Sequence, residues 1–176
     1  MNKTERLLPV FMIILGITST ACRKDVEGLY IAPELEPYVA EFVAEAASYG
    51  VNVQLQDMEI NWVSFEGQPY LGMCTVFGAG DENDSGRRVG INVDLLEQYK
   101  EELASGEMVD AIRIVVAHEL GHCARELNLG HRNLLSHNGL HQESAMHYRA
   151  LNQTSWKLEK QNYYMELFVG TEDVDW

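Results

Sequence analysis

Residues 117–131 read AHELGHCARELNLGH and contain the pattern H-E-x-x-H as His118, Glu119 and His122. The preceding stretch, IRIVVA at 112–117, is apolar apart from one arginine. Residues four apart lie on the same face of a helix, one turn from each other. We therefore expect a core helix that presents two imidazoles to a single metal ion.

This pattern is typical of zinc hydrolases. A carboxylate next to the first histidine reaches a water molecule on the metal but not the metal itself. Zinc lowers the pKa of such a water to about 7, and Glu119 can then accept its proton and pass it to a leaving amine. The sequence thus predicts Zn2+ as cofactor, His118 and His122 as ligands and Glu119 as general base. The alternative is two surface histidines on an ordinary helix, which the apolar surroundings disfavour because buried neutral histidines need partners.

A third protein ligand has to come from further along the chain. His131 follows His122 by nine residues. A helix that ran on to Leu129 would carry the chain roughly 10 Å past His122, at ~1.5 Å per residue, so His131 reaches the metal only if the chain turns back. Asn128 and Gly130 both accept the left-handed conformation that ends helices. We place His131 first among the candidates, and the others are, in order, Glu143, then His137 or His141.

Further downstream, residues 144–148 read SAMHY. Together with HELGH and the later Gly-His pair, this motif resembles the metzincin metallopeptidases, some of which, the astacins among them, carry S-x-M-H-Y. The sequence is also similar to small bacterial exported zincins with HELGHC and a late histidine. The resemblance covers chiefly residues 112–148. It implies a peptidase that hydrolyses peptide bonds, with Met146 in a tight turn beneath the metal and Tyr148 binding the metal or stabilising the oxyanion. It also implies that an edge strand binds extended peptides, for which residues 72–77 are the candidate and an internal strand is the alternative.

The chain departs from the metzincin pattern H-E-x-x-H-x-x-G-x-x-H in its second half. Arg125 and Asn128 stand where the family has its glycine and its third histidine. A second interpretation therefore stays open, a non-catalytic zinc-binding or partner-binding envelope lipoprotein. Four protein ligands would close such a structural site, and the histidines at 137, 141 and 147 are available for it. A closed site does not need Glu119, so its presence favours the enzyme.

The first 22 residues differ from the rest of the chain. A short polar start is followed by LLPVFMIILGI at 7–17, an apolar run too short to span a bilayer but typical of a secretory signal. TSTAC, which ends at Cys22, resembles a bacterial lipoprotein processing site, although Ser19 stands where leucine is usual. We expect lipidation of Cys22, and the alternative is ordinary signal cleavage near Ala21. Both export the protein to the bacterial cell envelope, facing the periplasm or the exterior.

The domain organisation follows from this break in composition. We expect a signal peptide over 1–21, a tether over 22–32 and one metallopeptidase domain over 33–176. The net charge of −14 becomes −15 in the mature chain, because the signal removes two cations and one acid. This charge excludes nucleic acid as a partner and adsorption to anionic lipid. The expected partners are a peptide or protein substrate, and a membrane only through Cys22; a monomer is favoured.

The remaining cysteines, Cys74 and Cys123, form an even pair once Cys22 is set aside. In an oxidising compartment they make either a disulfide or two buried free thiols, and the sequence favours neither.

Hydrophobic periodicity and the order of the expected elements predict an α+β fold. The resemblance implies that this fold is zincin-like, with a small mixed sheet packed on the active-site helix, a Met-turn and a C-terminal helix. Helices are expected over 33–49, 95–104, 107–126 and 153–165, and strands over 51–56, 58–65, 71–77 and 88–93. Residues 78–86 read as a loop and residues 128–151 as mostly irregular.

Overall fold

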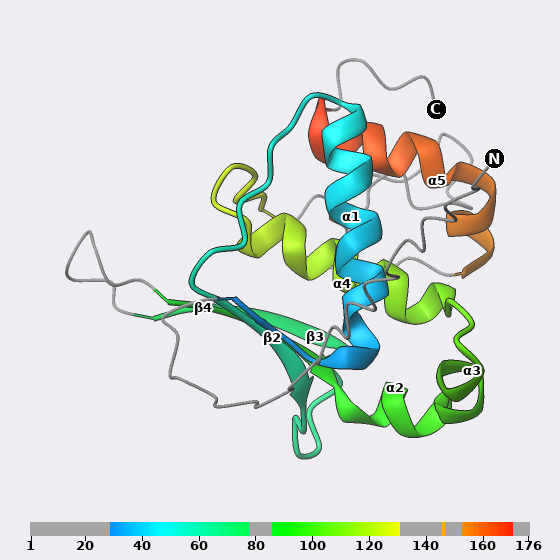
Figure 1. Cartoon of the computed structure of the whole chain (residues 1–176). Coiled ribbons are helices and arrows are strands. Elements are labelled where there is room, and N and C mark those ends of the chain that lie inside the picture. The colour runs from blue at the N-terminus through cyan, green and yellow to red at the C-terminus, as the bar shows by residue number, and fades with distance from the viewer. Residues whose placement is uncertain (1–28, 78–85, 131–145, 147–152, 171–176) are drawn as a thin grey trace, which may run out of the picture.

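The structure is a computed structural model that describes residues 29–77, 86–130, 146 and 153–170. It is a mixed α+β fold, as the periodicity predicts (Figure 1). Its elements, in chain order, are β1 Tyr30–Ile31, the 3-10 helix η1 Pro33–Leu35, α1 Glu36–Ser48, β2 Met58–Val63, β3 Gly72–Val76, β4 Arg87–Asn92, α2 Val93–Gln98, α3 Lys100–Ser105, α4 Asp110–Cys123 and α5 Gln153–Phe168. The expected signal peptide and Cys22 lie outside the described residues. No helix within those residues is both long enough and apolar enough to cross a bilayer.

The four strands form one mixed sheet in the order β1-β2-β4-β3. Strands β1, β2 and β4 are parallel, and β3 runs antiparallel to β4. Within the described residues, strand β3 therefore lies at an edge of the sheet, so of the two alternatives for residues 72–77 the structure shows the edge strand and not the internal one. The short strand β1 falls within the expected tether, so the sheet begins before residue 33.

Three helices, α1, α4 and α5, lie on the same side of the sheet (Figure 1). Helix α4 is the central one, because it contacts β3, β4, α1 and α5. A group of ion pairs joins the three helices around Arg113 of α4, which is only 15% exposed. Its Nε donates to Glu41 of α1 at 2.8 Å, and Glu41 also pairs with Lys160 of α5. The helix that carries the HExxH motif is thus fixed on the sheet and on both neighbouring helices.

One predicted strand is wrong. Residues 51–56 alternate apolar and polar, and Val53 and Leu55 are indeed buried, but the segment pairs with no strand among the described residues. Val51 continues from the end of α1, with its N–H donating to the Ala46 carbonyl at 3.0 Å. The alternation therefore indicates which side chains of this segment are buried, but it does not indicate pairing with a neighbouring strand.

The helices differ from prediction mainly at their ends. The helix expected over 95–104 is two short helices, α2 and α3, because the backbone of Tyr99 departs from helical geometry. Helix α3 ends at Ser105, and Gly106, the residue that caps it, has a positive φ of 80°. Helix α4 ends at Cys123, three residues before the expected end, since Ala124 is extended.

Candidate metal centre

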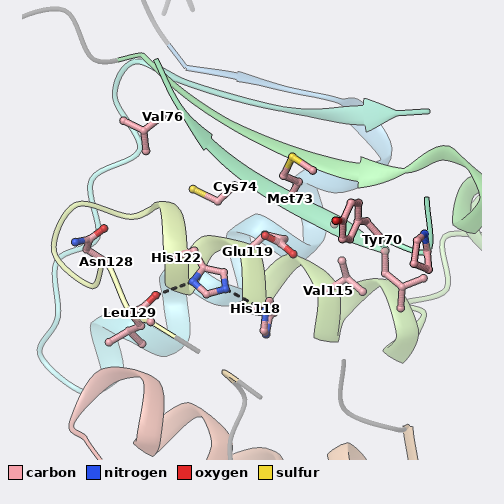
Figure 2. A pocket seen from close by; sticks show the side chains of 14 residues that line it. Tyr70, Met73, Cys74, Val76, Val115, His118, Glu119, His122, Asn128 and Leu129 are labelled. Carbon is pink, nitrogen blue, oxygen red and sulfur yellow. Dashed lines mark hydrogen bonds between the residues drawn. The ribbon is translucent and has the colours of Figure 1, made fainter. Parts of the chain in front are cut away.

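Helix α4 brings the two motif histidines together at the surface of the core. The Nε2 atoms of His118 and His122 are 3.1 Å apart, and both rings lie at the same side of the helix (Figure 2). Two imidazole nitrogens that share a tetrahedral zinc at ~2.0–2.1 Å stand about 3.3 Å from each other. The same distance suits a hydrogen bond between the rings when no cation lies between them. The pair therefore fits two ligands of one zinc ion.

A backbone carbonyl fixes the orientation of His122. Its Nδ1 lies 2.6 Å from the Leu129 carbonyl oxygen, so that Nδ1 carries the proton and donates it. In the neutral ring this leaves the lone pair on Nε2, the nitrogen that faces His118. Metal-binding histidines are commonly oriented in this way by an acceptor on the other ring nitrogen.

The carbonyl of Leu129 is in place because the chain turns back after α4. Asn128 adopts the left-handed conformation, with φ 44°, and the N–H of Leu129 then donates to the Gly121 carbonyl at 2.9 Å. This turn confirms the reversal that the sequence suggested at 128–130. Gly130 consequently lines the same cleft as the two histidines. His131 itself lies outside the described residues, so its role as third ligand stays a prediction.

The candidate general base lies under strand β3. Glu119 is 7% exposed, and burial raises the pKa of its carboxyl group to about 7, because the charged form loses its hydration. A hydrogen bond from the Cys74 N–H acts in the opposite direction. A carboxyl group that titrates near neutrality suits a general base.

Met146 lies against helix α4. Its side chain is fully buried, and a Cβ built on Gly121 would stand 2.7 Å from its sulfur. Because Gly121 immediately precedes His122, the sulfur packs directly behind the motif. Its role as the floor beneath a metal, which the resemblance implied, stays a prediction. The other downstream candidates, Glu143, His137, His141 and Tyr148, lie outside the described residues.

An open cleft of about 1010 Å3 runs between β3 and α4 and contains His118, Glu119 and His122 (Figure 2). Its remaining lining within the described residues is mostly apolar and includes Tyr70, Leu71, Met73, Val76 and Val115. Among the described residues, no group of three or more His, Cys, Asp or Glu side chains is arranged for metal binding.

Comparisons with known proteins do not identify the site, so its geometry is the basis for interpreting it. No family model, no curated protein and no solved structure matches this chain.

The structure adds a disulfide to the site. Cys74 of β3 is bonded to Cys123 of α4, with their Cα atoms 5.5 Å apart. This decides between the two alternatives that the sequence left open, because a pairing depends on Cα distances that spacing alone does not give.

Sequence reasoning missed Gly72, which lets β3 approach Glu119 closely. A Cβ at this position would lie 2.6 Å from Cγ of Glu119 and 2.7 Å from Cγ1 of Val115. An isolated glycine inside a strand is a known sign of such close approach, so the signal was present in LGMCTVF.

Replacing Gly72 by alanine is expected to force β3 away from α4. Overpacking of this kind costs about 1–3 kcal/mol, and it also moves the Cys74 amide away from the base. The free energy of unfolding, measured by denaturant titration, should fall by this amount. Gly86→Ala is the matched control, because a Cβ there meets nothing within 4 Å. An alanine at 72 that is as stable as the control would contradict the close contact.

Proposed function

We propose that this protein is a zinc-dependent metallopeptidase with a zincin-like active site, which hydrolyses peptide bonds. The observation that carries the proposal is the convergence of the His118 and His122 Nε2 atoms, 3.1 Å apart, beside a buried Glu119 in an open cleft. A structural zinc site would have no use for a carboxylate with a raised pKa next to the ligands. The mostly apolar lining of the cleft also suits a substrate better than a closed ligand shell.

The motif residues of α4 have different proposed roles. His118 and His122 would hold the zinc, with His131 as the proposed third ligand. When bound, zinc acts as a Lewis acid that lowers the pKa of water and polarises a carbonyl group. Glu119 accepts the proton of the attacking water and delivers it to the leaving amine. Its burial prepares it for this step, because its pKa near 7 allows it both to take up and to release a proton.

Strand β3 is the proposed binding surface for the peptide chain. The Asn92 N–H donates to the Leu71 carbonyl, and the Phe77 N–H donates to the Gly86 carbonyl. Given the register between β3 and β4, residues 71, 73, 75 and 77 are therefore the positions that hydrogen-bond to β4. The backbone groups of Gly72 and Val76 therefore face away from β4, toward the cleft side of the edge. An extended peptide can add to these groups as a further strand. Tyr148 remains a proposed oxyanion-stabilising residue.

We also propose that the protein is exported to a bacterial cell envelope and anchored by a lipid on Cys22. The disulfide between Cys74 and Cys123 supports an oxidising compartment, since structural disulfides are rare in the cytosol. Mass spectrometry of the mature N-terminus tests the anchor. An unmodified terminus following Ala21 would contradict lipidation and leave simple secretion.

Removal of the metal tests the proposed reaction. The purified protein should bind one zinc per chain and cleave a quenched-fluorescence peptide library. Dialysis against a chelator should abolish cleavage, and added Zn2+ should restore it. His122→Ala should bind zinc at least roughly tenfold more weakly, because it removes one of the protein ligands. Cleavage that survives complete zinc removal would overturn the proposal.

A further inference from the structure

We propose that the Cys74–Cys123 disulfide is a positioning element of the active site: it holds edge strand β3 on helix α4, so that the backbone of Cys74 keeps Glu119 in place. This proposal rests on the peptidase function proposed above. It assigns a role to two side chains that the reaction itself does not use.

The disulfide joins the two sides of the cleft, strand β3 and helix α4. Cys123 directly follows His122 at the end of α4 and is fully buried. Cys74 lies at the centre of β3, two residues from Gly72 and therefore on the same face of the strand, the face that meets α4. Figure 2 shows Cys74 above Glu119 and His122, between the strand and the helix. A single covalent link therefore fixes the distance between a metal-binding segment and the proposed substrate strand.

The same cysteine also contacts the base through its backbone. Cys74 is one of the residues whose N–H faces away from β4, since it stands opposite Val89 at a non-hydrogen-bonded position. That N–H donates to the Glu119 carboxylate instead. Any movement of β3 away from α4 would break this hydrogen bond first. Cys74 thus makes two contacts with α4: its sulfur is bonded to Cys123, and its N–H donates to the Glu119 carboxylate.

A strand at a sheet edge needs such support. Within the described residues, β3 has a strand partner only on its β4 side. The Asn92 side chain supports its beginning, by donating to the Tyr70 carbonyl at 2.8 Å. Residues 78–85, which follow its other end, lie outside the described residues. The disulfide is a covalent link between the middle of β3 and the helix that bears the proposed catalytic groups.

The test is the double variant Cys74→Ala/Cys123→Ala, compared with Val39→Ala. Val39 is buried in α1, so its truncation lowers stability without touching β3 and controls for a general loss of fold. We expect the double variant to keep one zinc per chain and to lose roughly 10- to 100-fold in kcat, the cost of misplacing a catalytic group by about 1 Å. Val39→Ala should retain the wild-type kcat on its folded, zinc-loaded fraction.

Amide hydrogen exchange gives a readout that does not depend on activity. In the double variant, the protection of the residue 74 amide should fall at least tenfold, while the amides of Ile60 and Val89 in β2 and β4 keep theirs. Equal loss of protection at all three amides would mean that the disulfide only stabilises the fold, and would overturn the positioning role. Unchanged protection at residue 74 would overturn it too. If even the wild type cleaves no peptide, the peptidase proposal fails, and the exchange pattern still decides this one.

Discussion

Glu119→Gln is expected to lower kcat for peptide hydrolysis by about 10²- to 10⁴-fold, the range that a general acid–base group contributes. Glutamine has the same shape and can still accept the Cys74 N–H through its amide oxygen, but it cannot take up a proton from the attacking water. Zinc binding should remain at one ion per chain, because His118 and His122 are untouched. The effect should therefore fall on kcat, with little change in KM.

Glu126→Gln is the matched control for this variant. Glu126 is exposed, lies seven residues further along the chain, and accepts a hydrogen bond from the Gln54 N–H at 3.2 Å. The same chemical change there should leave kcat unaltered. Two outcomes would count against the enzyme. If wild type and Glu119→Gln both bind zinc and neither cleaves any peptide, the protein is a zinc-binding lipoprotein without catalytic activity. If both are equally active, Glu119 is not the base.

The motif helix was predictable from sequence because its signals are local. The apolar run before the first histidine indicates burial, and the i, i+4 spacing brings His118 and His122 together on any α-helix. The reversal at Asn128 could be expected from its tolerance of the left-handed conformation, and Asn128 has φ 44°. What the sequence did not provide was the acceptor for His122, the Leu129 carbonyl, since every residue has a carbonyl group and only the fold selects one.

The sheet was less predictable, because a strand is defined by its neighbours. Residues 51–56 alternate as a strand does, yet the sheet takes Tyr30–Ile31 beside β2 instead. Those two residues are too few for any periodicity to reveal. The edge position of β3 and its bond to α4 are likewise long-range facts, decided when Cys74 and Cys123 meet across 49 residues. The coarse α+β class follows from local patterns, whereas the contacts that shape the cleft do not.

Raising the pH from about 4.5 to about 7 is expected to destabilise the metal-free protein through Glu119, and Glu119→Gln should remove this loss. Burial raises the pKa of the carboxyl group from 4.5 to about 7, so the folded state binds the proton more tightly than the unfolded state does. The stabilisation is complete below the unfolded pKa and is lost as the pH rises through the folded one. At 1.36 kcal/mol per pKa unit, the loss approaches about 3 kcal/mol.

The measurement is the free energy of unfolding by denaturant, taken across this pH range for both proteins in the presence of a chelator. Wild type and variant differ only at residue 119, so the difference between the two curves reports the carboxyl group. That difference should grow with pH in favour of glutamine and, when the titration is extended, level off about one pH unit above the folded pKa of about 7, where the folded carboxyl is almost fully charged. Parallel curves would mean that the carboxylate is well solvated in the folded protein. In that case the cleft would not supply the apolar surroundings that raise the pKa of the base, and Glu119 would have to act with an ordinary carboxylate pKa.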